Sequence, residues 1–284
     1  MSRKNKTSIT QSQKMMVFVL TMSLYGLATL FTELIPKFQV GIVEFSVEYF
    51  LFIPLTLAML FDPLSAALGA ATGELIFSEI MLGQFGGLGE MEKFLTVTIG
   101  VYIAGRMIKN PKNIKMVGFA AIVGVTLQQS MGAVVDILKV QFAVQDFKAI
   151  AGLPQSVYVT ESFSCLNDIL FSGILFCMIP TMYLVPKLYG KIEPLLGMKP
   201  RDEHTILGND GIFTPKVIFM TLLGFGVAIA SAILSKGGYK LIDWEADWAK
   251  SSGAIVIGSI VAIVIATITL VQMKKRAKIE ITPN

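Results

Sequence analysis

The chain has 284 residues, of which 54% are hydrophobic and 15% are charged, and its mean hydropathy is +0.67. These values exclude an ordinary soluble domain and indicate an all-α membrane protein that crosses the bilayer several times. The formal net charge of +4 does not indicate nucleic-acid binding. The basic residues lie beside the apolar runs, where they report membrane orientation.

About eight membrane-spanning helices are expected, since roughly 20 apolar residues cross the hydrocarbon core of a bilayer. The second span is short and contains Pro54, and little more than Asp62 and Pro63 separates it from the third. These two spans should therefore form a close antiparallel hairpin. The expected ranges are 15–35, 46–61, 63–83, 92–108, 116–138, 161–186, 214–235 and 252–273.

Lys and Arg are distributed unevenly between the loops that join the spans. If the amino terminus is cytoplasmic, 17 of the 24 Lys and Arg residues fall on the inner side. That distribution satisfies the positive-inside rule, so a multi-pass protein of the cell membrane with both termini in the cytoplasm is expected. No small-residue cleavage site follows the first span, so we expect a retained helix and no cleaved signal peptide.

A boundary is expected in the polar stretch 187–213, because it contains two prolines and a run of charged residues. The two spans after it are plainer than the first six and look appended. The expected parts are a cytoplasmic tail 1–14, a six-helix membrane domain 15–186, a cytoplasmic connector 187–213, two further helices 214–273 and a basic tail 274–284.

The third span begins with small residues at four-residue spacing, a pattern that lets helix backbones approach closely in lipid. Such a face can dock a partner or pack within the bundle, and the sequence leaves both alternatives open. The candidate docking residues are Ala66, Ala67, Gly69, Ala70, Ala71 and Gly73.

Acidic residues collect on the expected outer side, and some of them lie one or more turns inside their helices. Glu74, eleven residues after Pro63, should lie about 16 Å along its helix, near the bilayer midplane. Ionisable groups at that depth are costly, which favours a functional role. Alternatively, an acid near a helix start stabilises the macrodipole, and Glu74 could be a structural hydrogen-bond partner. The candidate substrate-binding residues are Glu74, Glu79, Gln129, Asp136, Glu161 and Asp168.

Catalytic and metal-binding patterns of the soluble type are not expected in this chain. His204 is the one histidine and falls in the connector, so neither a His/Cys metal cluster nor an intramembrane protease is indicated. The glycine-rich run 83–89 follows a membrane helix and no strand, which argues against a phosphate-binding loop. We therefore expect no enzyme and no cofactor bound by this chain.

The stretch from Phe52 to Glu74 resembles the second and third helices of the substrate-binding S components of energy-coupling factor (ECF) vitamin transporters. It has an apolar helix with an internal proline, a turn at Asp62-Pro63, and a small-residue helix with an acid eleven residues on. The resemblance extends more loosely over residues 15–186. The first helix lacks a clear alanine pair four residues apart, and the two spans after residue 213 exceed the usual length.

The resemblance implies a six-helix bundle that binds a vitamin or related micronutrient near its outer face, beneath the loop 36–45. It further implies docking onto a transmembrane scaffold subunit that carries two cytoplasmic ATPases, so that ATP is used by the partners. The acidic bias of the outer residues suggests a cationic or donor-rich substrate.

The alternative is a stand-alone secondary transporter coupled to H⁺ or Na⁺ through Glu74 and Asp168. Such transporters usually contain inverted repeats and broken helices, which are not evident in the sequence.

Overall fold

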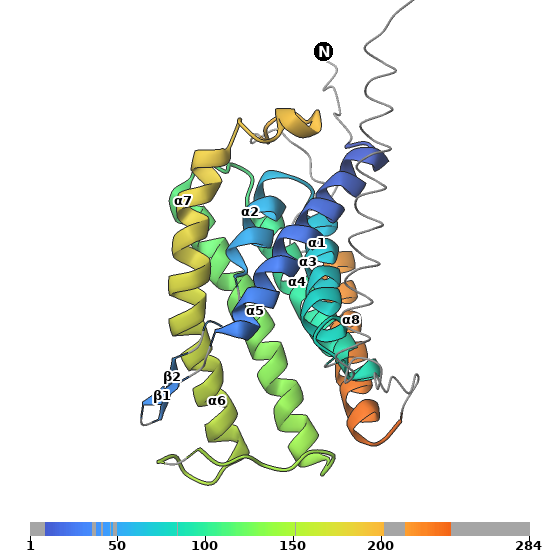
Figure 1. Cartoon of the computed structure of the whole chain (residues 1–284), viewed down its shortest axis with the longest axis vertical. Coiled ribbons are helices and arrows are strands. Elements are labelled where there is room, and N and C mark those ends of the chain that lie inside the picture. The colour runs from blue at the N-terminus through green and yellow to red at the C-terminus, as the bar shows by residue number, and fades with distance from the viewer. Residues whose placement is uncertain are drawn as a thin grey trace, which may run out of the picture. The chain divides into compact units, whose positions relative to one another are not determined.

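The computed structural model describes residues 9–35, 38–40, 42–45, 47, 50–83, 85–150, 152–201 and 214–239. These residues are mostly helical (Figure 1). The expected span 252–273, the basic tail 274–284 and His204 lie outside the described residues.

The helices follow the expected spans in chain order. Among the helices that make up a whole expected span by themselves, the second is the shortest. Their bounds are α1 (Gln11–Leu34), α2 (Phe52–Leu60), α3 (Pro63–Glu74), α4 (Glu90–Met107), α5 (Ile114–Gln141), α6 (Val157–Asp168), α7 (Ile179–Leu188) and α8 (Pro215–Lys236).

Shorter elements extend or connect these helices. A π-helical segment, η1 (Leu75–Ile80), continues α3, and a longer one, η3 (Ile169–Met178), joins α6 to α7 without a break. Two single 3₁₀ turns are η2 (Gly87–Gly89) and η4 (Pro194–Leu196). Strands β1 (Phe38–Val40) and β2 (Val43–Phe45) form an antiparallel hairpin in which Gln39 lies opposite Glu44.

The expected hairpin of the second and third spans is present, and its turn has a local cause. The Asp62 side chain caps α3 by accepting hydrogen bonds from the Ser65 backbone N–H at 2.9 Å and the Ser65 hydroxyl at 2.7 Å. Pro63 occupies the first helical position, where its missing N–H costs no hydrogen bond. The chain therefore reverses between α2 and α3 at Asp62.

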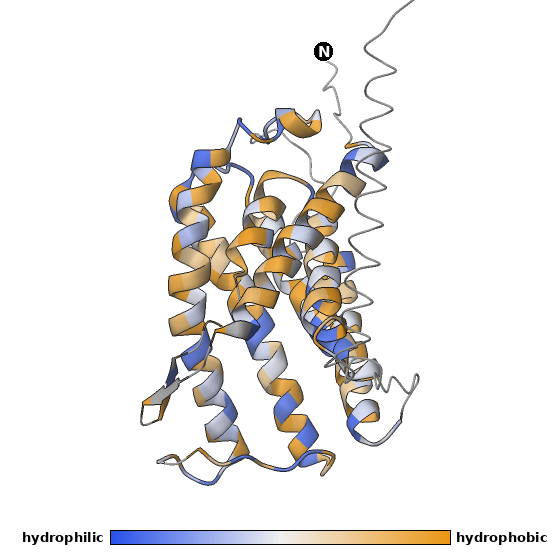
Figure 2. Ribbon diagram, in the orientation of Figure 1, coloured by the Kyte–Doolittle hydropathy of each residue, from blue (hydrophilic) through white to orange (hydrophobic). Residues whose placement is uncertain are grey.

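By length and composition, four helical stretches of the described chain could cross a membrane: Gln11–Glu33, Ile114–Gln141, Val157–Leu188 and Pro215–Lys236. Much of their surface is apolar, and hydrophilic residues concentrate in the lower turns of α5 and α6 in Figure 2. The structure thus supports a helical protein suited to a lipid environment.

The small residues of α3 pack inside the bundle. A Cβ added at Gly69 would lie 2.4 Å from the Phe18 carbonyl oxygen, and one at Gly73 would lie 2.3 Å from the Met22 carbonyl oxygen. The backbones of α1 and α3 can touch because these two residues lack side chains. This contact fits the alternative of packing within the bundle, and all six candidate docking residues are buried within the chain: Ala66, Ala67, Gly69, Ala70, Ala71 and Gly73.

Helix α8 packs against α4, α5 and η2, and its Ser235 hydroxyl lies 3.0 Å from the position of a Cβ added at Gly89. It belongs to the same compact unit as α1–α7. Helix α8 thus packs with the preceding helices, while the expected boundary at 187–213 stays a prediction.

Candidate functional site

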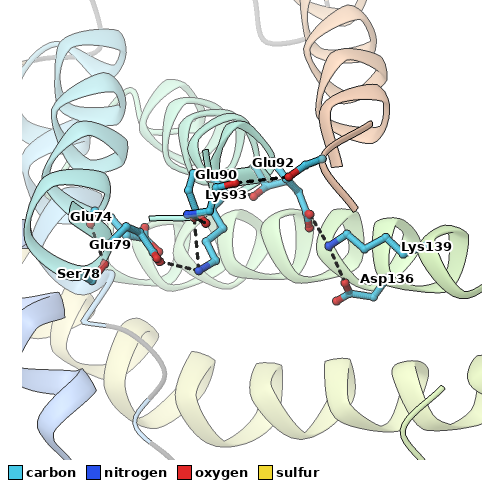
Figure 3. Close-up of polar contacts among 11 residues, drawn as sticks. Glu74, Ser78, Glu79, Glu90, Glu92, Lys93, Asp136 and Lys139 are labelled. Carbon is cyan, nitrogen blue, oxygen red and sulfur yellow. Dashed lines mark hydrogen bonds and ion pairs between the residues drawn. The ribbon is translucent and has the colours of Figure 1, made fainter. Parts of the chain in front are cut away.

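Charged side chains meet at the end of the bundle opposite the α2–α3 turn, on both sides of the first turn of α4 (Figure 3). On one side, the Lys93 ammonium lies 2.6 Å from Glu79 Oε1 of η1 and 3.6 Å from Glu90 Oε2. The Glu79 side chain is 7% exposed, whereas that of Lys93 is 55% exposed. Lys93 therefore reaches from a partly solvated position to a buried carboxylate.

A small cleft lies beside this ion pair. Its lining includes Glu74, Glu79, Glu90 and Lys93, together with Ala71, Leu75 and Phe94. The cleft has room for roughly one water molecule. Pockets for drug-sized ligands enclose about 300–1,000 Å³, so a vitamin would require the surrounding helices to separate.

Glu74 ends α3 and contributes a carboxylate to the wall of the cleft. Its Oε2 atom is buried and accepts no hydrogen bond from the described residues. The Tyr25 hydroxyl of α1, also buried, interacts electrostatically with Glu74. Ser78 does not bond to the Glu74 carboxylate; its hydroxyl donates to the Glu74 backbone carbonyl at 2.7 Å. Glu74 is thus a buried acid whose hydrogen-bonding capacity is only partly used.

The second charged group lies between α4 and α5. Lys139 Nζ is 2.6 Å from Glu92 Oε2 and 3.0 Å from Asp136 Oδ1. Lys139 is buried, and burial of an ammonium without a carboxylate partner would be strongly unfavourable. Glu161 of α6 interacts electrostatically with Asp136 and Lys139. The ion pairs therefore join α4 to α5, and Glu161 of α6 lies close enough to feel their charges.

Other polar atoms without hydrogen-bond partners lie in the middle of α5 and in the first turn of α6. Gln128 Oε1, Gln129 Nε2 and Thr160 Oγ1 are buried, and none of them bonds to another described residue. The Gln128 side chain lies against Gly100 of α4, where a Cβ would be 3.2 Å away. Buried amides usually have partners, so these positions are suited to contact with water or a polar ligand.

The β1–β2 hairpin contacts the helices through α6. Asn167 donates a hydrogen bond from Nδ2 to the Glu44 backbone carbonyl at 2.9 Å. Asp168, the next residue, marks the start of η3, just as Glu74 marks the start of η1. Both mid-helix acids singled out from the sequence therefore directly precede π-helical segments, which are rare and frequent at functional sites.

The six predicted site residues do not form a single pocket. Glu74 and Glu79 lie together at the cleft, while Asp136 and Glu161 lie near Lys139 on the other side of the α4 start. Gln129 lies about two helical turns from Asp136 along α5, and Asp168 lies about two turns from Glu161 along α6. In both cases the shift is toward the middle of the bundle. The candidate residues named from the sequence do not include Lys93, Lys139, Glu90 or Glu92. For Lys93 and Lys139, an acid three residues earlier in the chain was the available signal.

The opposite end of the bundle contains a buried arginine. Arg201 Nη1 donates to the carbonyls of Gly105 at 3.0 Å and Ile108 at 3.2 Å. Its Nη2 donates to the carbonyls of Ala58, at 3.1 Å, and Phe61. These oxygens belong to the C-terminal ends of α4 and α2, which lack helical partners and carry partial negative charge. One guanidinium therefore caps two helices.

The segment that carries Arg201 folds back onto this end. The Tyr189 hydroxyl donates to the Arg201 carbonyl at 2.6 Å, and Gln13 Nε2 of α1 donates to the Gly197 carbonyl at 2.7 Å. Burial lowers the pKa of Arg201 from its ordinary value to about 9, while Asp62 and Glu193 act in the opposite direction. The guanidinium is therefore charged at neutral pH.

No group of three or more His, Cys, Asp or Glu residues suited to a metal ion occurs in the described part of the chain.

The part of the chain that the structure describes is helical, with four stretches long and apolar enough to span a membrane and with paired charges at one end. The chain belongs to a family of unknown function, DUF8171, whose sequence pattern matches residues 16–281. Comparisons with curated proteins and with solved structures gave no significant match.

Proposed function

We propose that the protein is the membrane-embedded substrate-binding subunit of an ATP-driven uptake transporter of the ECF type, and that it takes up a vitamin or related small micronutrient. The observation that carries this proposal is the meeting of charged side chains from η1, α4, α5 and α6 at one end of the bundle. Buried ionisable groups in a membrane protein are costly and typically line substrate or ion pathways.

The hairpin β1–β2 supports the same proposal. It connects α1 to α2 and contacts α6 through Asn167, next to the candidate residue Asp168. A loop in this position could cover a ligand held between α5 and α6, where Gln129 has an unpartnered amide nitrogen. Ligand entry would then require the hairpin to move.

The distribution of basic residues supports a cytoplasmic location for the Arg201 end. Lys14, Arg106, Lys109, Lys187 and Lys191 all belong to helix ends or turns on that side. The charged clusters would then face outward, as required of a subunit that collects substrate from outside. Docking to a scaffold subunit would involve residues other than the small ones of α3, which α1 and the rest of the bundle bury.

Two measurements on the full chain test this proposal. The first is co-purification from its native membrane: ATPase subunits and a second membrane protein are expected to remain bound. The second is binding of a panel of vitamins to the purified protein, with Glu79→Gln and Asp168→Asn compared with Glu33→Gln, which alters an exposed acid at the end of α1. We expect the first two variants to weaken binding at least about tenfold, since each removes a charged group that is worth about 1.5–3 kcal/mol when hydrogen-bonded. Absence of both ATPase partners and vitamin binding would reject the proposal.

A second candidate is ion-coupled transport by this chain alone, and the small cleft beside Glu74 is the observation that favours it. A space for roughly one water molecule, next to a carboxylate oxygen without a partner, suits a proton or a small monovalent cation better than a vitamin. Uptake into proteoliposomes that contain only this protein, driven by an ion gradient and lost in Glu74→Gln, would support this candidate over the first.

A further inference from the structure

Arg201 and Glu193 lie in the same folded segment, and both are buried, but their hydrogen bonding is very unequal. The guanidinium donates to four carbonyl oxygens of α2 and α4. The Glu193 side chain is fully buried, and neither of its oxygens accepts a hydrogen bond from any described residue. The two groups interact electrostatically without forming a direct ion pair.

A buried carboxylate without a partner is energetically costly, and its cost falls if a nearby guanidinium turns toward it. Arginine is suited to such a movement, because its long side chain presents donors on several edges of one planar group. If Arg201 turned to Glu193, the carbonyls of α2 and α4 would lose their caps. Each arrangement therefore satisfies one set of acceptors and leaves the other unsatisfied.

We propose that Arg201 is a two-position latch, which closes this end of the bundle when it bridges α2 and α4 and releases it when it pairs with Glu193. The closed position is the one in the structure. Gly105 makes this position possible, because a Cβ there would lie 2.8 Å from Ala58 Cβ and would hold the two helix ends apart. Release would let α2 and α4 separate and expose Ile108, which is 1% exposed in the closed position.

The latch also connects the two ends of the protein through α4. The same helix carries Glu90, Glu92 and Lys93 at its start and the Gly105 and Ile108 acceptors at its end. A shift of α4 caused by a ligand at the charged clusters would therefore change the fit of Arg201. This coupling rests on the proposed function, whereas the two positions of the latch can be tested without any ligand.

The experiment introduces Ile108→Cys into the full chain with Cys165→Ser, retaining the fully buried Cys177. A membrane-impermeant maleimide is the probe, applied to protein in lipid nanodiscs, and the chain without Ile108→Cys supplies the blank. Glu193→Gln removes the charge that attracts Arg201 but keeps the shape of the side chain. We expect it to slow labelling about tenfold, because a charge-assisted hydrogen bond of the open position is weakened.

Arg201→Lys is the matched variant that should change the labelling rate in the opposite direction. An ammonium cannot donate to both helix ends at once as the planar guanidinium does. We expect severalfold faster labelling in this variant. If Glu193→Gln is labelled as fast as the parent or faster, Glu193 is not an acceptor for a second position and the latch is rejected. The latch is also rejected if position 108 is never labelled in any folded variant. Failure of vitamin binding would leave both outcomes unchanged, so the two proposals can fail separately.

Discussion

Lys93 Nζ lies 2.6 Å from Glu79 Oε1, and this pair joins the first turn of α4 to the π-helical end of α3. The carboxylate is buried and the ammonium stem is half exposed, so the pair combines features of buried and surface ion pairs. Several expected outcomes depend on how strongly such pairs hold the helices together.

Replacement of Lys93 by methionine should destabilise the protein by about 1–2 kcal/mol, because Glu79 then remains buried without its partner. The value is lower than for a fully buried pair because solvent screens the exposed ammonium. Thermal unfolding in detergent measures the change, and Lys148→Met, at an exposed position, is the matched control. Addition of Glu79→Gln to Lys93→Met should restore part of the loss; no restoration would mean that Lys93 acts independently of Glu79.

The Lys139–Glu92 pair should show the stronger coupling, since its side chains are only 10% and 11% exposed. A double-mutant cycle with Lys139→Met and Glu92→Gln is expected to give a coupling energy of about 2 kcal/mol, against about 1 kcal/mol for Lys93 and Glu79. Equal coupling energies in the two cycles would show that burial does not determine their strengths.

Gly73→Ala should destabilise the packing of α1 on α3 by about 2 kcal/mol or more, because the new methyl group meets a backbone oxygen that cannot easily move. Gly132→Ala is the control, since no atom lies within 4 Å of the added Cβ. That change should stabilise α5 slightly through the higher helix propensity of alanine. The difference between the two melting temperatures is the measurement, and a similar response at both positions would contradict close contact between α1 and α3.

Arg201→Gln should lower stability by about 3 kcal/mol, because one buried carbamoyl group cannot replace the bridge across two helix ends. Folding lowers the pKa of Arg201 from its ordinary value to about 9, so the unfolded chain binds more protons only between about pH 9 and that ordinary value. Stability from this group therefore rises with pH in that window and is constant below it. The difference in melting temperature between wild type and variant should therefore be the same at pH 6 and pH 8. A clear dependence of this difference on pH would mean that a different group titrates when Arg201 is absent.

The sequence predicted the order and approximate bounds of the described helices because long apolar runs and the Asp62-Pro63 turn act locally. It left open which surface the small residues of α3 cover, because Gly69 and Gly73 fit α1 or a partner equally well by spacing alone. The structure brings Phe18 and Met22 against them.

Two of the four ion pairs among the described residues join separate helical elements. Lys139 belongs with Glu92, which lies on another helix, and no periodicity within one helix relates these residues. Nothing in the residues next to Arg201 in the chain indicates its four acceptors on α2 and α4. The candidate acids were thus chosen from their expected depth in the membrane. The identity of their basic partners depends on how the helices pack against one another.

The π-helical segment after Glu74 has a geometric consequence for the cleft. In an α-helix, residues five apart point in directions that differ by about 140°. The wider turn of a π-helix brings such residues back to nearly the same direction. Glu74 and Glu79 are five apart and both line the cleft. The π-helical turn therefore accommodates one extra residue and still keeps the two acids together. In a regular α-helix of the same sequence they would diverge, whereas deletion of one residue from 75–78 with a return to α-helix would place them four apart and again on one face.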